Sequence, residues 1–178
     1  VLAALCRQLQ EAVIAALKGW GLGGGIEIAI AAEIRIAGRS AKSGGPEVTR
    51  GWLGGGGASQ MLPRLVGVGQ AMKLLLTGDP VDADSALRIG MVEEVVDDDK
   101  LAARVMDVAM NIASFSPVAT QALTAAVRAA LSVPLEPGLH YETRFHVTLI
   151  SDPGPPQVST AFQRKPARKL STYAPPAH

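Results

Sequence analysis

Two glutamates and two glycine-rich segments are the residues of this 178-residue chain whose types and spacing could do chemistry. Glu27 lies in an apolar segment that follows the glycines of residues 19–25, and Glu47 follows the Gly-Gly-Pro turn at 44–46. Glycines at the start of a helix let backbone N–H groups approach a ligand oxygen closely, and such groups can stabilise an oxyanion. Two carboxyl groups beside that helix start would form a proton-transfer site.

Each glutamate also has a simpler interpretation. Glu27 falls in the first turn of its predicted helix, where an acid complements the helix dipole and the unpaired N–H groups. Glu47 stands in a turn that proline and glycine fix, and such turns often present catalytic groups, but an isolated glutamate there is often only solvated. The residues alone leave both interpretations open.

The glycine clusters partly resemble known nucleotide-binding patterns. Residues 19–24 formally match the dinucleotide fingerprint, and Arg39 could suit a 2′-phosphate. The helix predicted over 25–33 has only about two and a half turns, which is short for that fold, so this alternative is less favoured. The second cluster, 54–57, lacks the Gly-Lys-Ser/Thr ending of a phosphate-binding loop and is interpreted as an active-site wall or a mobile loop.

Histidine, cysteine and charge exclude several other classes. His140 and His146 are six residues apart and fall on different helix faces, so neither a metal site nor a Ser-His-Asp triad is expected. A single cysteine, Cys6, is typical of a reducing compartment, which predicts a cytoplasmic protein. The net charge of +1 gives no long-range attraction for nucleic acid or for an anionic membrane.

The elements that must position the glutamates follow from hydrophobic patterning. With 48% hydrophobic but only 4% aromatic residues, the core must consist of small aliphatic side chains, as in α/β or all-α proteins. Short apolar runs predict buried strands, and longer periodic segments predict helices. The strands are expected at 13–17, 34–38 and 92–96, and the helices at 26–33, 58–65, 82–90, 100–113, 117–131 and 134–149. The segment 19–25 is predicted to contain no regular structure.

Several segments together resemble the enoyl-CoA hydratase/isomerase, or crotonase, family in both order and spacing. They are 13–19 (VIAALKG), 22–27 (LGGGIE), 45–47 (GPE), 62–67 (LPRLVG), 76–80 (LTGDP) and 86–92 (ALRIGMV). The resemblance implies an α/β fold, a crotonase-like spiral of ββα units followed by a C-terminal helical trimerisation region. We expect a partial core with the catalytic acids at 1–115, a helical oligomerisation region at 116–151, and a Pro-rich, basic, mobile tail at 152–178.

The resemblance, which is closest to enoyl-CoA hydratases, also assigns site residues. Gly24 matches a glycine whose backbone N–H is one of two donors to the thioester oxygen. Glu27 and Glu47, 20 residues apart, match two acids that hold a water molecule in hydratases. The acid matching Glu27 helps to activate this water, and the acid matching Glu47 delivers a proton to the α-carbon. The other implied substrate-binding positions are Gly23, Gly25, Pro46, Leu53 and Gly55.

The implied activity is hydration of trans-2-enoyl-CoA thioesters to 3-hydroxyacyl-CoA, a lyase reaction of fatty acid metabolism such as β-oxidation. No metal or redox cofactor is implied, because coenzyme A is part of the substrate. The implied assembly is a homotrimer, or a hexamer built as a dimer of trimers, with no nucleic acid or membrane partner. Isomerases often keep only one of the acids, so isomerisation or retro-Claisen hydrolysis is an alternative, as is a truncated, non-catalytic subunit.

The chain also departs from the family pattern. The family's second oxyanion donor lies in an N-terminal segment that this sequence lacks, so we expect an N-terminally truncated chain. In the second glycine cluster, Gly54 replaces the usual proline, Ala58 a glycine and Met61 an arginine, which predicts a less rigid loop. Trp20 and Trp52 are candidates for the wall around the acyl chain, although burial is the commoner outcome for such aromatics.

Overall fold

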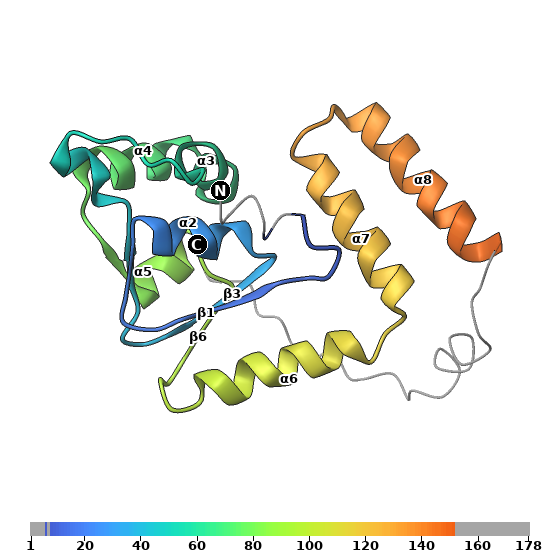
Figure 1. Cartoon of the computed structure of the whole chain (residues 1–178), viewed down its shortest axis with the longest axis horizontal. Coiled ribbons are helices and arrows are strands. Elements are labelled where there is room, and N and C mark those ends of the chain that lie inside the picture. The colour runs from blue at the N-terminus through green and yellow to red at the C-terminus, as the bar shows by residue number, and fades with distance from the viewer. Residues whose placement is uncertain (1–5, 7, 152–178) are drawn as a thin grey trace.

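The larger of two small sheets forms the centre of the molecule. The computed structural model describes residue 6 and residues 8–151 (Figure 1). Strands β1 (Ile14–Leu17), β3 (Ile34–Gly38) and β6 (Glu94–Val96) pair in parallel in the order β1-β3-β6. Ile36 and Ala37 on the central strand are almost completely buried, as expected for a parallel sheet covered on both faces. The three strands predicted from apolar runs are confirmed.

The second sheet contains β2 (Trp20–Leu22), β4 (Lys42–Gly44) and β5 (Val81–Asp82). Strand β2 pairs in parallel with β4, and β5 runs antiparallel to β4. The prediction that residues 19–25 contain no regular structure was therefore wrong. Backbone hydrogen bonds to β4 stabilise a strand that its glycine content disfavours, so tertiary pairing overrides local propensity.

Short helices follow the strands and complete repeated ββα units. Helix α2 (Gly24–Ala31) follows β1 and β2, whereas the 3₁₀ helix η1 (Pro46–Arg50) and helix α3 (Ala58–Val66) follow β3 and β4. Helix α4 (Val68–Thr77), which the sequence analysis did not predict, and α5 (Ala83–Arg88) come next. The two strands of each unit lie in different sheets, so the chain winds as a spiral, as the crotonase resemblance implies.

Asp82 is the N-cap of α5, in the segment 82–90 that was predicted to be a helix. Its side chain accepts a 2.8 Å hydrogen bond from the backbone N–H of Ser85, which is a standard helix N-cap. Hydrogen bonds from Ser85 to the carboxylate lower the pKa of Asp82 below its usual value.

Three longer helices make up the C-terminal part of the described chain. Helix α6 (Leu101–Ala113) packs against β1 and β3, and α7 (Pro117–Ala130) and α8 (Leu135–Ser151) form a hairpin that projects from the sheets (Figure 1). Arg128 on α7 ties this hairpin to the core, because its Nε and a terminal nitrogen donate to Glu33 Oε1 over 2.9 and 2.6 Å. The predicted mobile tail at 152–178 lies outside the described residues.

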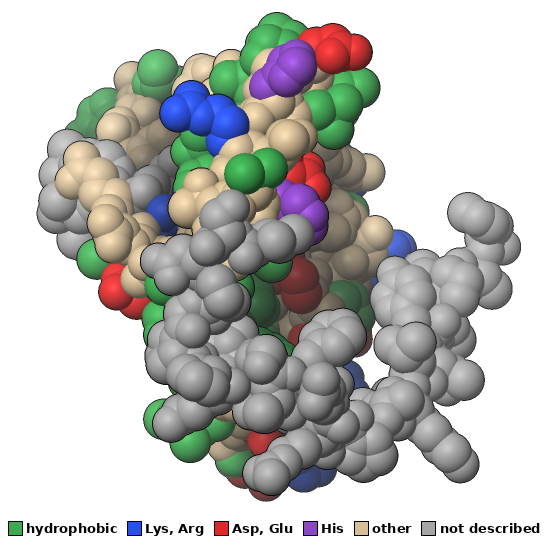
Figure 2. All heavy atoms as spheres, turned by 90° about the vertical axis from the view of Figure 1, so that its right-hand side faces the viewer, with side chains coloured by type: hydrophobic (Ala, Val, Ile, Leu, Met, Phe, Trp, Pro, Cys, Tyr) green, Lys and Arg blue, Asp and Glu red, His purple; other side chains and the backbone are tan. Residues whose placement is uncertain are grey.

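The α7–α8 hairpin presents apolar side chains at its surface. Figure 2 shows this side of the molecule, where hydrophobic and polar side chains alternate. Large exposed side chains on the hairpin include Val118, Leu123, Val127, Leu135 and Leu139. No helix among the described residues is long and apolar enough to cross a membrane.

Candidate active site

Two neighbouring parallel strands bring the predicted site residues together. Leu22 at the end of β2 lies opposite Gly44 at the end of β4, so the chain leaves both strands at the same edge of the sheet. Helix α2 begins directly after β2, and η1 begins directly after β4. The topology therefore places Gly24 and Glu27 beside Glu47, although 20 residues separate the two acids in sequence.

The start of α2 presents backbone N–H groups at this edge. Gly23 adopts φ 55°, a left-handed conformation that favours glycine, and its N–H donates to the carbonyl of Gly44 over 3.0 Å. Gly24 is the first residue of the helix, so its N–H has no acceptor within α2. Among the described residues no other acceptor is recorded for it. The predicted oxyanion donor is thus available to a ligand.

Glu27 is buried, with a relative exposure of 6%. Its Oε1 accepts hydrogen bonds from the backbone N–H groups of Gly56 (2.8 Å) and Ala58 (3.2 Å). Those groups belong to the start of α3, which has no side-chain cap of its own. Glu27 therefore complements the N-terminus of α3, whereas the simpler interpretation named the N-terminus of its own helix, α2. Its Oε2 packs against Gly56.

Glu47 is half-buried in the first turn of η1 and approaches the same loop. A Cβ built on Gly54 would lie 2.9 Å from Glu27 Oε1 and 3.5 Å from Glu47 Oε1. Both carboxylates therefore converge on one glycine of the second cluster. Of the two interpretations of this cluster, an active-site wall or a mobile loop, the close packing favours the wall, because a Cβ built on Gly56 would overlap the Glu27 carboxylate.

A pocket of about 340 Å³ opens beside Glu47. Four residues that the family resemblance implied line it: Gly23, Gly24, Pro46 and Glu47. Leu22 and Arg50, which the sequence analysis did not select, complete the wall together with Trp52. Arg50 could have been found only by recognising that 46–50 form a helical turn.

The other predicted substrate-binding residues lie outside this pocket. Leu53 is 81% exposed, and no side chain or backbone atom would lie within 4 Å of a Cβ built on Gly25 or Gly55. Their assignment to substrate binding stays a prediction from the family resemblance.

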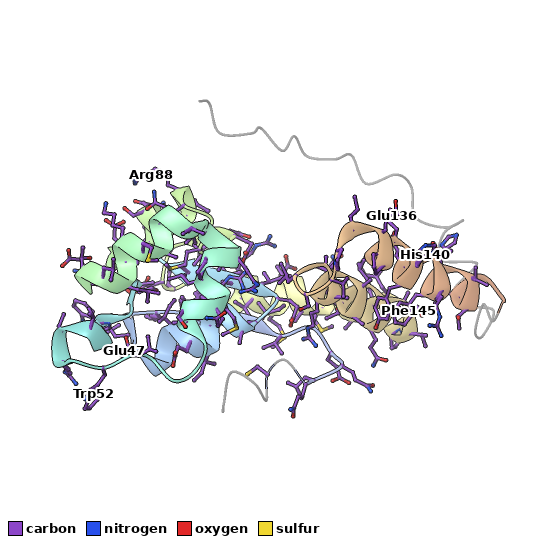
Figure 3. The ribbon with its side chains drawn as sticks, turned by 90° about the horizontal axis from the view of Figure 1, so that it is seen from above. Glu47, Trp52, Arg88, Glu136, His140 and Phe145 are labelled. Atoms are coloured by element: carbon purple, nitrogen blue, oxygen red, sulfur yellow. The ribbon has the colours of Figure 1, made fainter. Side chains whose placement is uncertain are left out.

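Both tryptophans are exposed rather than buried, so the expectation of burial was wrong. Trp52 lies near Glu47 (Figure 3) and lines the pocket, and its backbone N–H donates to the backbone carbonyl of Glu47 over 3.0 Å. The amine of Lys42 lies 5.0 Å from the centre of the Trp20 ring, a cation–π contact at the surface. The chain therefore keeps an aromatic side chain at the mouth of the site.

The arrangement does not fit the alternative of a dinucleotide site. Strand β2 occupies the middle of the glycine segment, where the dinucleotide fingerprint requires a tight turn. Arg39 forms ion pairs with Asp97 (3.1 Å) and Asp84 (3.7 Å) instead of standing free for a phosphate. Among the described residues, no group of three His, Cys, Asp or Glu side chains could hold a metal ion.

The repeated ββα units, with paired acids at one sheet edge, define a crotonase-type α/β protein. The model of the family described as "Enoyl-CoA hydratase/isomerase" matches residues 2–165, nearly the whole chain. The chain therefore belongs to the enoyl-CoA hydratase/isomerase family.

Named relatives and solved structures agree with this assignment. The chain is 38% identical over 165 residues to a short-chain-enoyl-CoA hydratase of Clostridium acetobutylicum, covering 93% of this chain and 62% of that protein. It is 40% identical over 138 residues to a crotonyl-CoA hydratase of Syntrophomonas wolfei, with 78% and 53% covered. The crystal structure of an enoyl-CoA hydratase from Bacillus anthracis superposes with a TM-score of 0.87 at 36% identity, covering 90% of this chain and 62% of that one. The chain thus spans somewhat more than half the length of these relatives.

Proposed function

We propose that the full-length protein is a lyase that hydrates trans-2-enoyl-CoA thioesters to 3-hydroxyacyl-CoA. The observation that carries this proposal is the convergence of Glu27 and Glu47 on Gly54, beside the N–H of Gly24. Relatives named short-chain-enoyl-CoA hydratase and crotonyl-CoA hydratase support the same reaction. Both Glu27 and Glu47 lie next to Gly54. This pair favours hydration over isomerisation, because isomerases often keep only one of the two acids.

The two glutamates are proposed to divide the proton transfers. Two backbone N–H groups hold the Glu27 carboxylate through Oε1, the oxygen that lies on the Gly54 side beside Glu47. This carboxylate is proposed to accept a proton from a water molecule as the water oxygen attacks the β-carbon. Glu47 in its protonated form then donates a proton to the α-carbon, so that one water molecule has been added to the substrate. Return of the proton from Glu27 to Glu47 through solvent restores the starting state. Negative charge that develops on the thioester oxygen is stabilised by the Gly24 N–H and, by family resemblance, by a second donor in the upstream segment.

The proposed reaction needs no metal or redox cofactor, since its steps are proton transfers and a water addition. Coenzyme A enters and leaves as part of the substrate and product. We propose that this reaction serves fatty acid β-oxidation, and that the protein acts in the cytoplasm.

We also propose that the α7–α8 hairpin mediates assembly into a homotrimer or a dimer of trimers. The hairpin projects from the sheets and carries exposed Leu123, Val127, Leu135 and Leu139. Its two helices enclose an apolar groove of about 520 Å³. Exposed apolar surface of this kind is typical of a protein–protein interface.

The loss of the conjugated thioester absorbance of crotonyl-CoA tests the activity in the full-length protein. Glu27→Gln and Glu47→Gln should each lower kcat by a factor of about 10² or more, the usual contribution of a proton-transferring group. Glu136→Gln is the matched control, because Glu136 is exposed on α8 at the opposite end of the molecule (Figure 3). A folded protein that does not hydrate crotonyl-CoA, or whose rate ignores both active-site substitutions, would refute the proposal.

A further inference from the structure

An unpaired arginine lies in the wall of the pocket beside the proposed proton donor. Arg50 lines the same pocket as Glu47, and its side chain is exposed. No ion pair or side-chain hydrogen bond of Arg50 occurs among the described residues, although Glu47 is only three positions away. The guanidinium group is therefore available to an anionic ligand.

The geometry of η1 directs Arg50 and Glu47 to the same side. A 3₁₀ helix has three residues per turn, so side chains at positions i and i+3 lie one above the other. Gly51 ends the turn with φ 72°, and the hydrogen bond from the Trp52 N–H to the Glu47 carbonyl folds the chain back over the pocket. The backbone conformation of residues 46–52 therefore places Arg50 and Trp52 next to Glu47.

The rest of the wall has no charged side chain. Leu22, Gly23, Gly24 and Pro46 supply aliphatic groups and backbone. Arg50 is the cationic side chain in this pocket wall, so it is the group there that attracts an anion. Arginine also suits a carboxylate in particular, because its planar fork can donate two parallel hydrogen bonds.

From these contacts we infer that Arg50 recognises a second carboxylate on the acyl group, so the preferred substrate is the enoyl-CoA thioester of a dicarboxylic acid. This inference rests on the proposed hydration at the same site. Gly24 marks the thioester end of the pocket, Glu47 acts at the α-carbon, and Arg50 stands one turn further along η1.

The length of the turn indicates the length of the acyl chain. Three residues of 3₁₀ helix rise about 6 Å. An extended chain advances by roughly 1.2 Å per bond, as in a polypeptide. The backbone spacing of Glu47 and Arg50 therefore equals four or five such bonds, which makes the six-carbon diacid the first compound to test.

A matched pair of substrates tests this inference with the full-length protein. trans-2-Hexenoyl-CoA and trans-2-hexenedioyl-CoA differ only in that a terminal methyl group is replaced by a carboxylate. The wild type should show a kcat/KM for the dioyl thioester at least about tenfold higher than for the hexenoyl thioester. Arg50→Leu should reduce the dioyl value by about 10- to 100-fold, the usual contribution of a charged hydrogen bond, so the ratio of the dioyl value to the hexenoyl value should fall by a similar factor.

Two further variants separate recognition from loss of structure. Arg50→Lys keeps the charge but not the fork, and should retain part of the preference for the dioyl thioester. Arg88→Leu removes an exposed arginine from the end of α5, which lies apart from Glu47 and Trp52 (Figure 3), and should change neither value. Circular dichroism confirms that each variant is folded.

The outcomes distinguish this inference from the proposed function. If neither thioester is hydrated, the proposed function itself fails. If hexenoyl-CoA is hydrated without a preference for the diacid, the reaction stands and the role of Arg50 is overturned. An equal loss for both substrates in Arg50→Leu would also overturn it, because Arg50 would then contact the shared coenzyme A or support Glu47.

Discussion

Gly56 is the position at which the structure makes its sharpest prediction about the site. Its N–H donates to Glu27 Oε1 over 2.8 Å, and a Cβ built on it would lie 2.7 Å from Glu27 Cδ and 3.1 Å from Glu27 Cβ. A Cβ that close to the base of a buried side chain cannot be accommodated by moving the carboxylate alone. Gly56→Ala must therefore displace both the loop and Glu27.

The expected cost of Gly56→Ala follows from three contributions. Overpacking costs about 1–3 kcal/mol. Weakening the hydrogen bond to the carboxylate adds about 1.5 kcal/mol or more. The lower entropy of the unfolded chain returns about 0.4–1 kcal/mol. The free energy of unfolding should therefore fall by about 3 kcal/mol, which corresponds to roughly 6–12 °C in Tm for a domain of this size.

Gly56→Ala should also strongly lower the rate of hydration. A displacement of about 1 Å in a reacting group can reduce the rate about 10²-fold. The assay is the hydration of crotonyl-CoA by the full-length protein, together with urea unfolding. Gly69→Ala is the control, because Gly69 lies in α4 and a Cβ built there meets no atom within 4 Å. If Gly56→Ala matches this control in both rate and unfolding midpoint, the proposed packing of Glu27 against the loop is wrong.

Three other predictions concern the elements around the site. Gly23→Ala should lower the free energy of unfolding by about 1–2 kcal/mol in urea titrations because φ is 55°, and should also slow crotonyl-CoA hydration because the new Cβ would lie 3.1 Å from Glu47 Oε1. Because folding lowers the pKa of Asp82, the ionised carboxylate stabilises the fold at pH values above about 4, the pKa of the unfolded chain. This stabilisation is lost as the pH falls through the lower pKa of the folded state. Asp82→Asn keeps the N-cap and should flatten this acid limb of a plot of Tm against pH; an unchanged limb would contradict the assignment. Arg128→Met should cost about 1–3 kcal/mol in unfolding free energy, and a double-mutant cycle with Glu33→Gln should show coupling; additive effects would contradict it.

The parts of the fold that could be predicted from sequence are those with a strong local signal. Strand β3 was placed correctly at residues 34–38 because its apolar run is bounded by glycine and is buried. Helix α7 was placed within one residue, since Ser116 and Pro117 mark its start, and the Ser116 hydroxyl accepts from the backbone of the first turn. These elements have intrinsic preferences that agree with their tertiary environment.

The parts that were missed depend on contacts between segments distant in sequence. Strand β2 contains a glycine and is stabilised by pairing with β4, which no local pattern reveals. The position of Arg50 in the pocket was missed because 46–50 resembles a loop in composition, whereas the helical turn places Arg50 in the same pocket wall as Glu47. The two acids themselves were found because the family resemblance supplied the pairing that their separation in sequence conceals.

At Gly54 the chain has glycine at a position that lies next to both acids. The resemblance places it where the family usually has proline, and from this alone a less rigid loop was expected. In the structure, any Cβ at this position would lie 2.9 Å from Glu27 Oε1, so a side chain would force the carboxylate away from the α3 N–H groups that hold it. A side chain at this position, including the proline that the family usually has, therefore requires the end of the Glu27 side chain to shift, whereas glycine lets the backbone approach both acids without that shift.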